Sequence, residues 1–324
     1  MKTLIQIIKS FIYSRFPALF DSLSKRRLAL KRFKARMKWK LFKKEISGDT
    51  LANQLRYQGG IRAGDIIMVH SSLSSIGKVI GGPETVCRAL QKVVTESGTI
   101  LMPCYHQFEP VIKMLRAGSS IDLRDAKSSV GKLTETFRNL PGVVRSSHPF
   151  SSVCAWGRTA AEITGSHSAS PLMCGPGSPF SKLLELSGKY MGIGVDIRIV
   201  ALYHVLEDNW NGFPVKVHYP EPFTAKYMDG SGQFVQRELI VLDPDVSRNR
   251  IDQDIEGAWI RAWLTDHMKH RGILQEFMLG QALSWVVDAN AFFQEMKYLA
   301  QQGITIYTTK ADFFQNKLNE IVFE

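Results

Sequence analysis

The stretch from Asp65 to Gly82, DIIMVHSSLSSIGKVIGG, constrains the fold of this 324-residue chain more than any other. It opens with the β-branched apolar residues Ile66, Ile67 and Val69, a pattern typical of a buried strand, and closes with hydroxyls and glycines where that strand should end. Pro83 then opens a helix. A strand, a small-residue loop and a helix N-terminus in series favour a phosphate or pyrophosphate site. An ordinary strand-to-helix turn is the alternative, since the stretch has neither GxGxxG nor GKS/T.

Strands and helices are predicted to alternate from Thr50 onward, which indicates an α/β fold with a mixed sheet and helices on both of its faces. The predicted helices cover 50–59, 83–95, 134–139, 179–186, 198–210, 249–269 and 288–300, with one more at the end of the chain. The predicted strands cover 65–72, 99–103, 189–195, 215–219, 223–228, 233–242 and 304–308. Asp229-Gly230 is a turn signal, so an antiparallel hairpin is expected to add to the sheet. Residues 106–130 are expected to form a long loop beside an acceptor pocket.

The positive charge is concentrated at the N-terminus. Residues 1–49 hold fourteen Lys and Arg against three Asp and Glu, so the formal net charge of +11 belongs to this segment and the rest is neutral. We therefore expect a basic amphipathic segment at 1–48 and one catalytic domain at 49–324. Residues 1–45 suit peripheral contact with an anionic membrane. Packing on the body or on a second subunit, as in a homodimer, is the alternative, and no recognition motif favours nucleic acid.

The remaining composition indicates a cytoplasmic protein, either free or peripheral to the inner membrane. The four cysteines show no CxxC spacing, which favours reduced thiols. No apolar run reaches the ~18 residues of a membrane span, and nothing resembles a cleavable secretory signal. Cys104 and His106 are close in sequence, but no further ligand spacing supports a metal, so none is expected.

Histidines and an arginine supply candidate functional groups. His204 and Glu207 are three residues apart on a predicted helix, so the carboxylate could orient the imidazole or hold its charged form. An ordinary surface or core ion pair is the alternative. Arg145 could offer a fork to a phosphate, and His148 begins a turn at His148-Pro149 in which it could equally be structural. Ser178 is an expected helix N-cap.

Several blocks in this order resemble the aminoglycoside 3-N-acetyltransferase (antibiotic acetyltransferase) family. They are MVHSSLSSIG in the opening stretch, GKLTETFRNLPGVVRSSHPFSSVCAWG at 131–157, CGPGSPFSKLLELSGKYMGIGV at 174–195 and LYHVLE at 202–207. The resemblance covers roughly residues 50–300. Members usually carry an Asn-Thr or similar polar pair shortly before the catalytic histidine, where this chain has Val200-Ala201. That difference concerns the acceptor side more than the coenzyme side.

The resemblance implies direct acetyl transfer from acetyl-CoA to the 3-amino group of an aminoglycoside. His204 would be the general base, oriented by Glu207 or by Glu256, and the Ser72 hydroxyl with neighbouring backbone N–H groups would stabilise charge on the thioester oxygen. The residues expected to hold the coenzyme are Ser71, Ser74, Ser75, Gly77, Val79, Ile80, Arg145, His148, Ser152 and Ser178. No cysteine nucleophile is expected.

Two other functions stay open. The neutral body and the basic N-terminus also fit N-acetylation of an amino sugar in a surface polysaccharide, or in its nucleotide- or lipid-linked precursor. A non-catalytic membrane-surface binding protein on the same fold is the alternative from a different class, against which the presence of His204 and the serine loop argues.

Overall fold

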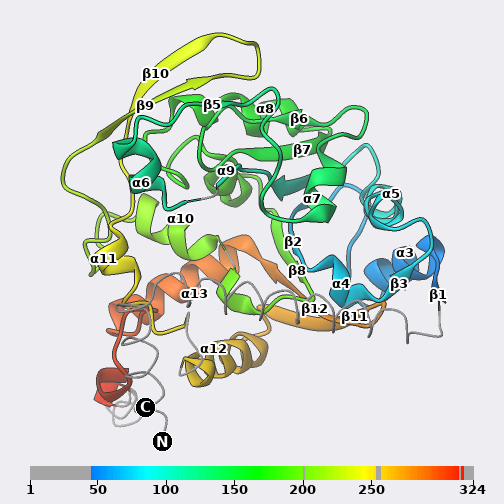
Figure 1. The fold of residues 1–324 in the computed structure, drawn as a ribbon. Helices are drawn as coiled ribbons and strands as arrows, with labels where there is room; N and C mark the ends of the chain where they lie inside the picture. The colour runs from blue at the N-terminus through cyan, green and yellow to red at the C-terminus, as the bar shows by residue number, and fades with distance from the viewer. Residues whose placement is uncertain (1–44, 108, 200, 253–256, 314, 317–324) are drawn as a thin grey trace, which may run out of the picture. The chain divides into compact units, whose positions relative to one another are not determined.

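The structure is a computed structural model that describes residues 45–107, 109–199, 201–252, 257–313 and 315–316. Its centre is a seven-stranded mixed sheet in the order β11-β12-β8-β2-β4-β7-β6 (Figure 1). The strands are β2 (Ile66–Ser71), β4 (Thr99–Pro103), β6 (Val144–Arg145), β7 (Val153–Gly157), β8 (Lys189–Ile193), β11 (Leu274–Leu279) and β12 (Ala282–Asp288). The mixed sheet with helices on both faces confirms the predicted fold class.

Strand β2 lies at the middle of three parallel strands. It pairs in parallel with β8 on one side and with β4 on the other, whereas β12 and β7 join the outer edges of this trio in antiparallel orientation. The predicted strand-loop-helix unit after Asp65 therefore starts in the centre of the sheet. Because the carboxyl ends of parallel strands meet at one edge, His70 and Ser71 lie where ligands gather in α/β folds.

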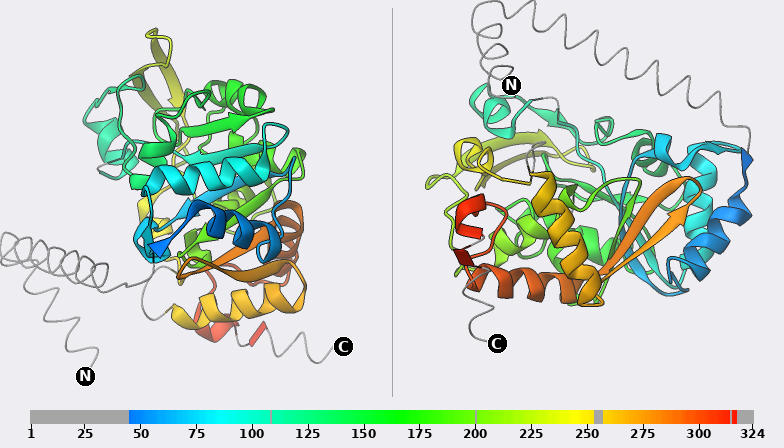
Figure 2. Two further views of the ribbon diagram at one scale, coloured as in Figure 1. Left: turned by 90° about the vertical axis from the view of Figure 1, so that its right-hand side faces the viewer. Right: turned by 90° about the horizontal axis from the view of Figure 1, so that it is seen from below.

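Alternate residues of the central strands face two separate hydrophobic cores. Ile67 and Val69 belong to the core under α3, α5 and α7, whereas Met68 belongs to the core under α8, α9, α10, α12 and α13. Figures 1 and 2 show the two helical layers on opposite faces of the sheet. The helices are α3 (Gly48–Tyr57), α5 (Pro83–Val94), α7 (Lys132–Phe137), α8 (Ala160–Gly165), α9 (Pro179–Glu185), α10 (Leu202–Asn209), α12 (Ala258–His270) and α13 (Ala289–Gln301).

The predicted hairpin forms, but in a second sheet. Strands β9 (Phe223–Met228) and β10 (Phe234–Leu239) pair in antiparallel register, and β9 pairs in parallel with β5 (Ile121–Asp122). This three-stranded sheet in the order β10-β9-β5 has its own small core, which includes Tyr227 and Leu239. The expectation that the hairpin extends the central sheet was therefore wrong. The antiparallel hairpin that does extend it is β11-β12, which the sequence interpretation missed.

Other predictions need correction as well. Segments 215–219 and 304–308 are not strands, apart from an isolated bridge between His218 and Leu242. The segment 106–130 contains α6 (Val111–Arg116) and β5 rather than loop alone. Helix α12 begins at Ala258, later than the predicted residue 249. Short elements complete the fold: β1 (Glu45–Ile46), α4 (Leu73–Ile76), β3 (Lys78–Val79), α11 (Pro244–Ser247) and the 3₁₀ turns η1 (His167–Ala169) and η2 (Ile197–Ile199).

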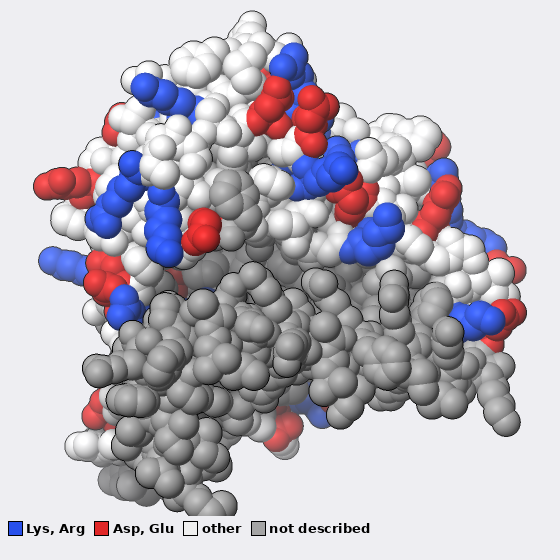
Figure 3. Space-filling view, viewed as in Figure 1, with Lys and Arg blue, Asp and Glu red and all other residues white. Residues whose placement is uncertain are grey.

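The surface of the described body carries charges of both signs, interspersed on the face drawn in Figure 3. The basic segment predicted at 1–48 lies almost wholly outside the described residues, and so do Glu256 and most of the closing helix. Within the described part of the chain, no helix is long and apolar enough to cross a bilayer. All four cysteines are buried and free.

Candidate active site

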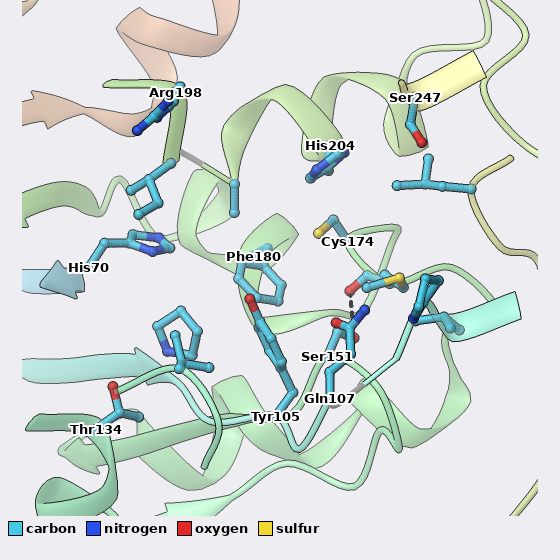
Figure 4. Close-up of a pocket in the computed structure, with 18 of the residues that line it drawn as sticks. His70, Tyr105, Gln107, Thr134, Ser151, Cys174, Phe180, Arg198, His204 and Ser247 are labelled. Carbon is cyan, nitrogen blue, oxygen red and sulfur yellow. Dashed lines mark hydrogen bonds between the residues drawn. The ribbon is translucent and has the colours of Figure 1, made fainter. Parts of the chain in front are cut away.

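A cavity of about 430 Å³ opens at the carboxyl ends of β2 and β4, with α10 on its other side. Figure 4 shows His70 entering it from the end of β2 and His204 from α10. Its wall is mainly apolar, with a few polar side chains. The described residues that line it include Val69, His70, Ser71, Pro103, Tyr105, Gln107, Val130, Thr134, Ser151, Met173, Cys174, Phe180, Arg198, Ile199, Ala201, His204, Leu242 and Ser247.

A chain of hydrogen bonds holds the His204 imidazole at this cavity. Nδ1 of His204 lies 2.6 Å from Oε2 of Glu207, and the hydroxyl of Tyr307 donates to Oε1 of the same carboxylate at 2.8 Å. The Glu207 side chain is fully buried, whereas that of His204 is 28% exposed. An ionised carboxylate can only accept hydrogen bonds, so Nδ1 of His204 must carry the hydrogen. The pair therefore fixes the ring orientation in which Nδ1 faces the carboxylate and Nε2 faces away from it.

The environment keeps Glu207 ionised although it is buried. Burial raises the pKa of its carboxyl, but the charge and hydrogen bond of His204, the Tyr307 hydroxyl and the Arg250 guanidinium outweigh this effect. The net result is a pKa below the ordinary value of a glutamate. A charged Glu207 can stabilise the imidazolium that forms when His204 accepts a proton.

Arg250 lies beside the basic nitrogen of His204. Its Nη1 is 3.4 Å from Nε2, and its guanidinium is paired with the buried Asp252 at 2.9 Å. The same guanidinium lies over the ring of Tyr203, 5.6 Å from the centroid. Asp252 and Tyr203 together hold Arg250 in place, so any substrate atom that reaches Nε2 also approaches a fixed cation.

His70 is the second histidine of the cavity. It is 8% exposed and stacks on Tyr190 with ring centroids 5.9 Å apart. Burial lowers its pKa to about 4, so the ring is neutral near pH 7. Its Nε2 is buried and has no hydrogen-bond partner among the described residues.

Only part of the serine loop, the small-residue stretch from Ser71 to Gly82, reaches the cavity. Ser71 lines the cavity, whereas Ser72 is not among the lining residues. The Ser72 N–H donates to the carbonyl of Ile193 at 2.8 Å, and its hydroxyl accepts from Ser75 Oγ at 2.9 Å. That backbone donor is therefore not available for an oxyanion at Ser72. Ser75 borders a separate, open hollow of about 340 Å³ together with Gly194.

The remaining residues of the serine loop that were expected to hold the coenzyme do not line the cavity. Ser74 and Ile80 are exposed, whereas Gly77 and Val79 are buried. Gly77 has a φ of 101°, a conformation that residues with a Cβ rarely adopt. The loop therefore presents backbone and small side chains at the surface beyond the cavity.

Three residues expected to hold the coenzyme form hydrogen bonds inside the protein instead. The Arg145 guanidinium donates to the carbonyls of Cys104, Leu123 and Ala126 and to Ser152 Oγ. Ser152 and Ser178 are fully buried, and Ser178 caps α9 by accepting from the Ser181 N–H. This placement corrects the expectation of a phosphate fork at Arg145, because its donors tie the 104–126 segment to β6.

His148 is likewise a buried structural residue. It stacks on His167 with centroids 4.7 Å apart, and its Nδ1 lies 2.8 Å from Ser151 Oγ. Burial holds its pKa well below the ordinary value. Of the expected site residues, the structure thus brings His204 and Ser71 to the cavity wall, and Glu207 lies buried behind His204.

Sequence reasoning missed His70, Arg250 and Tyr307. His70 stands inside the motif MVHSSLSSIG at the end of the predicted strand. The alternation Met68, His70 places both side chains on the face of the sheet that α8, α9, α10, α12 and α13 cover. Arg250 and Tyr307 are distant from His204 in sequence, and no local spacing signals their contact with the pair.

Comparisons with known proteins identify the family to which this fold belongs. The sequence model described as "Aminoglycoside 3-N-acetyltransferase" matches residues 68–301, more than two thirds of the chain. The chain is an acyltransferase of the aminoglycoside N(3)-acetyltransferase type. It belongs to the aminoglycoside 3-N-acetyltransferase family.

Curated relatives are distant. The chain is 27% identical over 248 residues to aminoglycoside N(3)-acetyltransferase IX of Micromonospora chalcea, which covers 72% of this chain and 86% of the relative. It is 32% identical over 161 residues to aminoglycoside N(3)-acetyltransferase VII of Streptomyces paromomycinus, covering 46% of this chain and 56% of the relative. This second match therefore spans little more than half of that protein.

Solved structures share the fold. Aminoglycoside acetyltransferase AAC(3)-Xa superimposes with a TM-score of 0.68 at 27% identity, covering 84% of this chain and 98% of that one. AAC-IIIb, in a binary complex with CoASH, gives 0.65 at 24% identity, covering 80% and 98%. AAC-VIa bound to sisomicin gives 0.65 at 24% identity, covering 78% and 96%.

Proposed function

We propose that this protein transfers the acetyl group of acetyl-CoA directly to an amine of an amino sugar, with His204 as general base. The observation that carries the proposal is the His204–Glu207 pair at the wall of the cavity. Its Nδ1–H is held by a charged carboxylate, so Nε2 is left to take a proton from the attacking amine. Histidine suits this step because its charge changes near neutral pH.

The coenzyme is proposed to approach along the serine loop. Its identity as acetyl-CoA is supported by AAC-IIIb, a protein of the same fold that was solved in a binary complex with CoASH. Ser71 lines the cavity in which the amine is proposed to attack the thioester. Ser74, Ser75 and Ile80 are proposed to contact the pantetheine and phosphates outside it, whereas Gly77 and Val79 are buried and would shape the loop. No described group of three or more His, Cys, Asp or Glu could hold a metal ion.

The first candidate acceptor is an aminoglycoside acetylated at its 3-amino group, because the family carries that description. The second is an amino sugar that also bears an anionic group, such as the phosphates of a nucleotide- or lipid-linked precursor. Arg250 favours the second, since this cation lies 3.4 Å from the nitrogen of His204 that must meet the acceptor. Arg198, which pairs with Asp196 at 3.3 Å, lines the cavity itself. A drug with several ammonium groups would place like charges near both.

Thiol release from acetyl-CoA tests the proposal. Purified protein is assayed with gentamicin- and sisomicin-type drugs and, in parallel, with free and nucleotide-linked amino sugars, and N-acetylated products are identified by mass spectrometry. Turnover on the drugs supports the first acceptor, and turnover confined to anionic amino sugars supports the second. Binding of acetyl-CoA or an acceptor without any turnover would instead identify a non-catalytic binding protein.

A further inference from the structure

The thioester carbonyl needs a hydrogen-bond donor that the described site does not offer at Ser72. When an amine attacks acetyl-CoA, a C–N bond forms and the carbonyl electrons move onto oxygen. Collapse then breaks the C–S bond, the electron pair leaves on sulfur, and the proton that His204 took from the amine neutralises the thiolate. A preorganised donor at the oxygen is among the largest contributions to such reactions. The Ser72 N–H is used by Ile193, and Ser72 does not line the cavity.

His70 lies where such a donor is needed. It comes from the carboxyl end of β2 and is the neighbour of Ser71, so it stands between the serine loop and the interior of the cavity. Figure 4 shows its ring directed into the same space as His204 but from the opposite element. His70 and His204 therefore face one cavity from two different elements.

The surroundings of His70 also favour a neutral donor. Nε2 is buried without a partner among the described residues, and an unpaired buried polar atom is unfavourable unless a ligand or water meets it. The face of the ring is fixed by its stacking on Tyr190, and the strand pairing of His70 with Gly192 fixes its backbone. With a pKa of about 4 the ring stays neutral, so it neither competes with His204 for the proton nor repels a protonated amine.

We propose that the neutral imidazole of His70 donates a hydrogen bond to the carbonyl oxygen of the acetyl thioester and stabilises the oxyanion of the tetrahedral intermediate. This inference rests on the proposed acetyl transfer and adds a catalytic residue to it. His70 takes the role that the sequence interpretation gave to Ser72. His204 and His70 then divide the chemistry, because one accepts the proton of the amine and the other stabilises the charge on oxygen.

Two substitutions at one position separate this role from a packing role. His70→Phe keeps a buried ring but removes the donor, whereas His70→Gln keeps an N–H of similar reach. We expect His70→Phe to lower kcat about 10²–10³-fold, as loss of one oxyanion donor does. In His70→Phe the KM for both substrates should stay within about threefold of wild type, since the donor acts mainly in the transition state. His70→Gln should have a kcat at least about tenfold higher than that of His70→Phe, because it keeps a donor. A kcat within about threefold of wild type in His70→Phe would overturn the proposal.

A measurement on the wild-type protein covers the case in which the variants fold poorly. The infrared carbonyl band of acetyl-CoA labelled with ¹³C at the carbonyl is recorded free and bound. The proposal requires the band to move to lower frequency on binding, and an unshifted band overturns it. If wild-type protein binds no acetyl-CoA, the proposed function fails and this inference with it. If wild type turns over and His70→Phe does so equally, only the inference fails.

Discussion

Glu207 shows how a buried carboxylate can orient a partly exposed histidine, His204, that is proposed to act as a base. Glu207 is buried, yet its pKa is lowered because His204, Tyr307 and Arg250 together outweigh the effect of burial. Each partner comes from a different part of the chain, so the pair is held by tertiary structure rather than by α10 alone. The spacing of the pair could be predicted from the sequence, whereas its two further partners could not.

Replacing Glu207 with Gln should remove the charge that stabilises the imidazolium while nearly preserving shape. We expect kcat to fall about 10²-fold, within the contribution of about 10²–10⁴ that a general base makes. Acetyl-CoA affinity, measured by calorimetry, should stay unchanged because Glu207 acts through His204. An equal loss of coenzyme affinity would assign Glu207 a structural role instead.

At the scale of elements, the junction of β8 and β12 depends on a glycine. Gly192 of β8 pairs with Trp285 of β12, and a Cβ at Gly192 would lie 2.1 Å from Cε2 of the Trp285 ring. Trp285 is held by a hydrogen bond from Nε1 to the carbonyl of Val195 at 2.7 Å, so the indole cannot shift freely. This contact positions β8, the strand that pairs with β2.

Gly192→Ala should therefore lower the free energy of unfolding by about 1–3 kcal/mol, as overpacking of a core does. Urea unfolding checks the effect. Gly230→Ala is the matched control, because a Cβ there meets nothing within 4 Å, and we expect a change of less than about 0.5 kcal/mol. Equal stability of the Gly192 variant and wild type would show that Trp285 moves without cost.

Element by element, the sequence predicted best where periodicity and capping agreed. Local signals correctly placed four elements: strand β2, helix α5 with its leading proline, helix α9 after its N-cap Ser178, and helix α13 after its N-cap Asp288. Segments 215–219 and 304–308 have strand-like composition but no continuous partner strand, so propensity alone misled the interpretation. The β9-β10 hairpin was recognised from its turn, yet its partner β5 is about a hundred residues away, and no local signal identifies it.

At the scale of the whole molecule, three buried histidines make stability depend on pH. Burial lowers the pKa of His70 to about 4 and that of His167 to about 3, and His148 also lies well below its ordinary value. In the unfolded chain each returns to about 6.5. Between these values the unfolded state binds protons that the native state does not, so stability falls as pH decreases.

We expect the free energy of unfolding to decrease from about pH 6.5 downward, by up to about 1.4 kcal/mol per pH unit for each of the three histidines. Urea unfolding at pH 7 and pH 5 measures this change. The variant His167→Gln should show a shallower decrease, whereas His270→Ala, at an exposed position, should match wild type. A stability that is flat between pH 7 and pH 5 would contradict protonation-linked unfolding.

The basic segment 1–45 lies outside the described residues, apart from its last residue, and its role stays a proposal from composition. We expect the full chain to sediment with liposomes containing anionic lipid at low salt and to be released by higher salt. A protein lacking residues 1–45 should stay in the supernatant while keeping its rate on a soluble acceptor. Unchanged sedimentation after the deletion would remove the membrane interpretation.

The central claim is that His204 is the base of an acetyl transfer from acetyl-CoA. The measurement that tests it most directly is kcat for thiol release at saturating acetyl-CoA and acceptor, compared between wild type and His204→Ala. His270→Ala serves as the control, since this exposed histidine on α12 is not among the residues that line the cavity. We predict a loss of about 10²–10⁴-fold in His204→Ala with acetyl-CoA affinity retained, and no loss in the control. A His204→Ala protein that keeps kcat within about threefold of wild type would contradict the account.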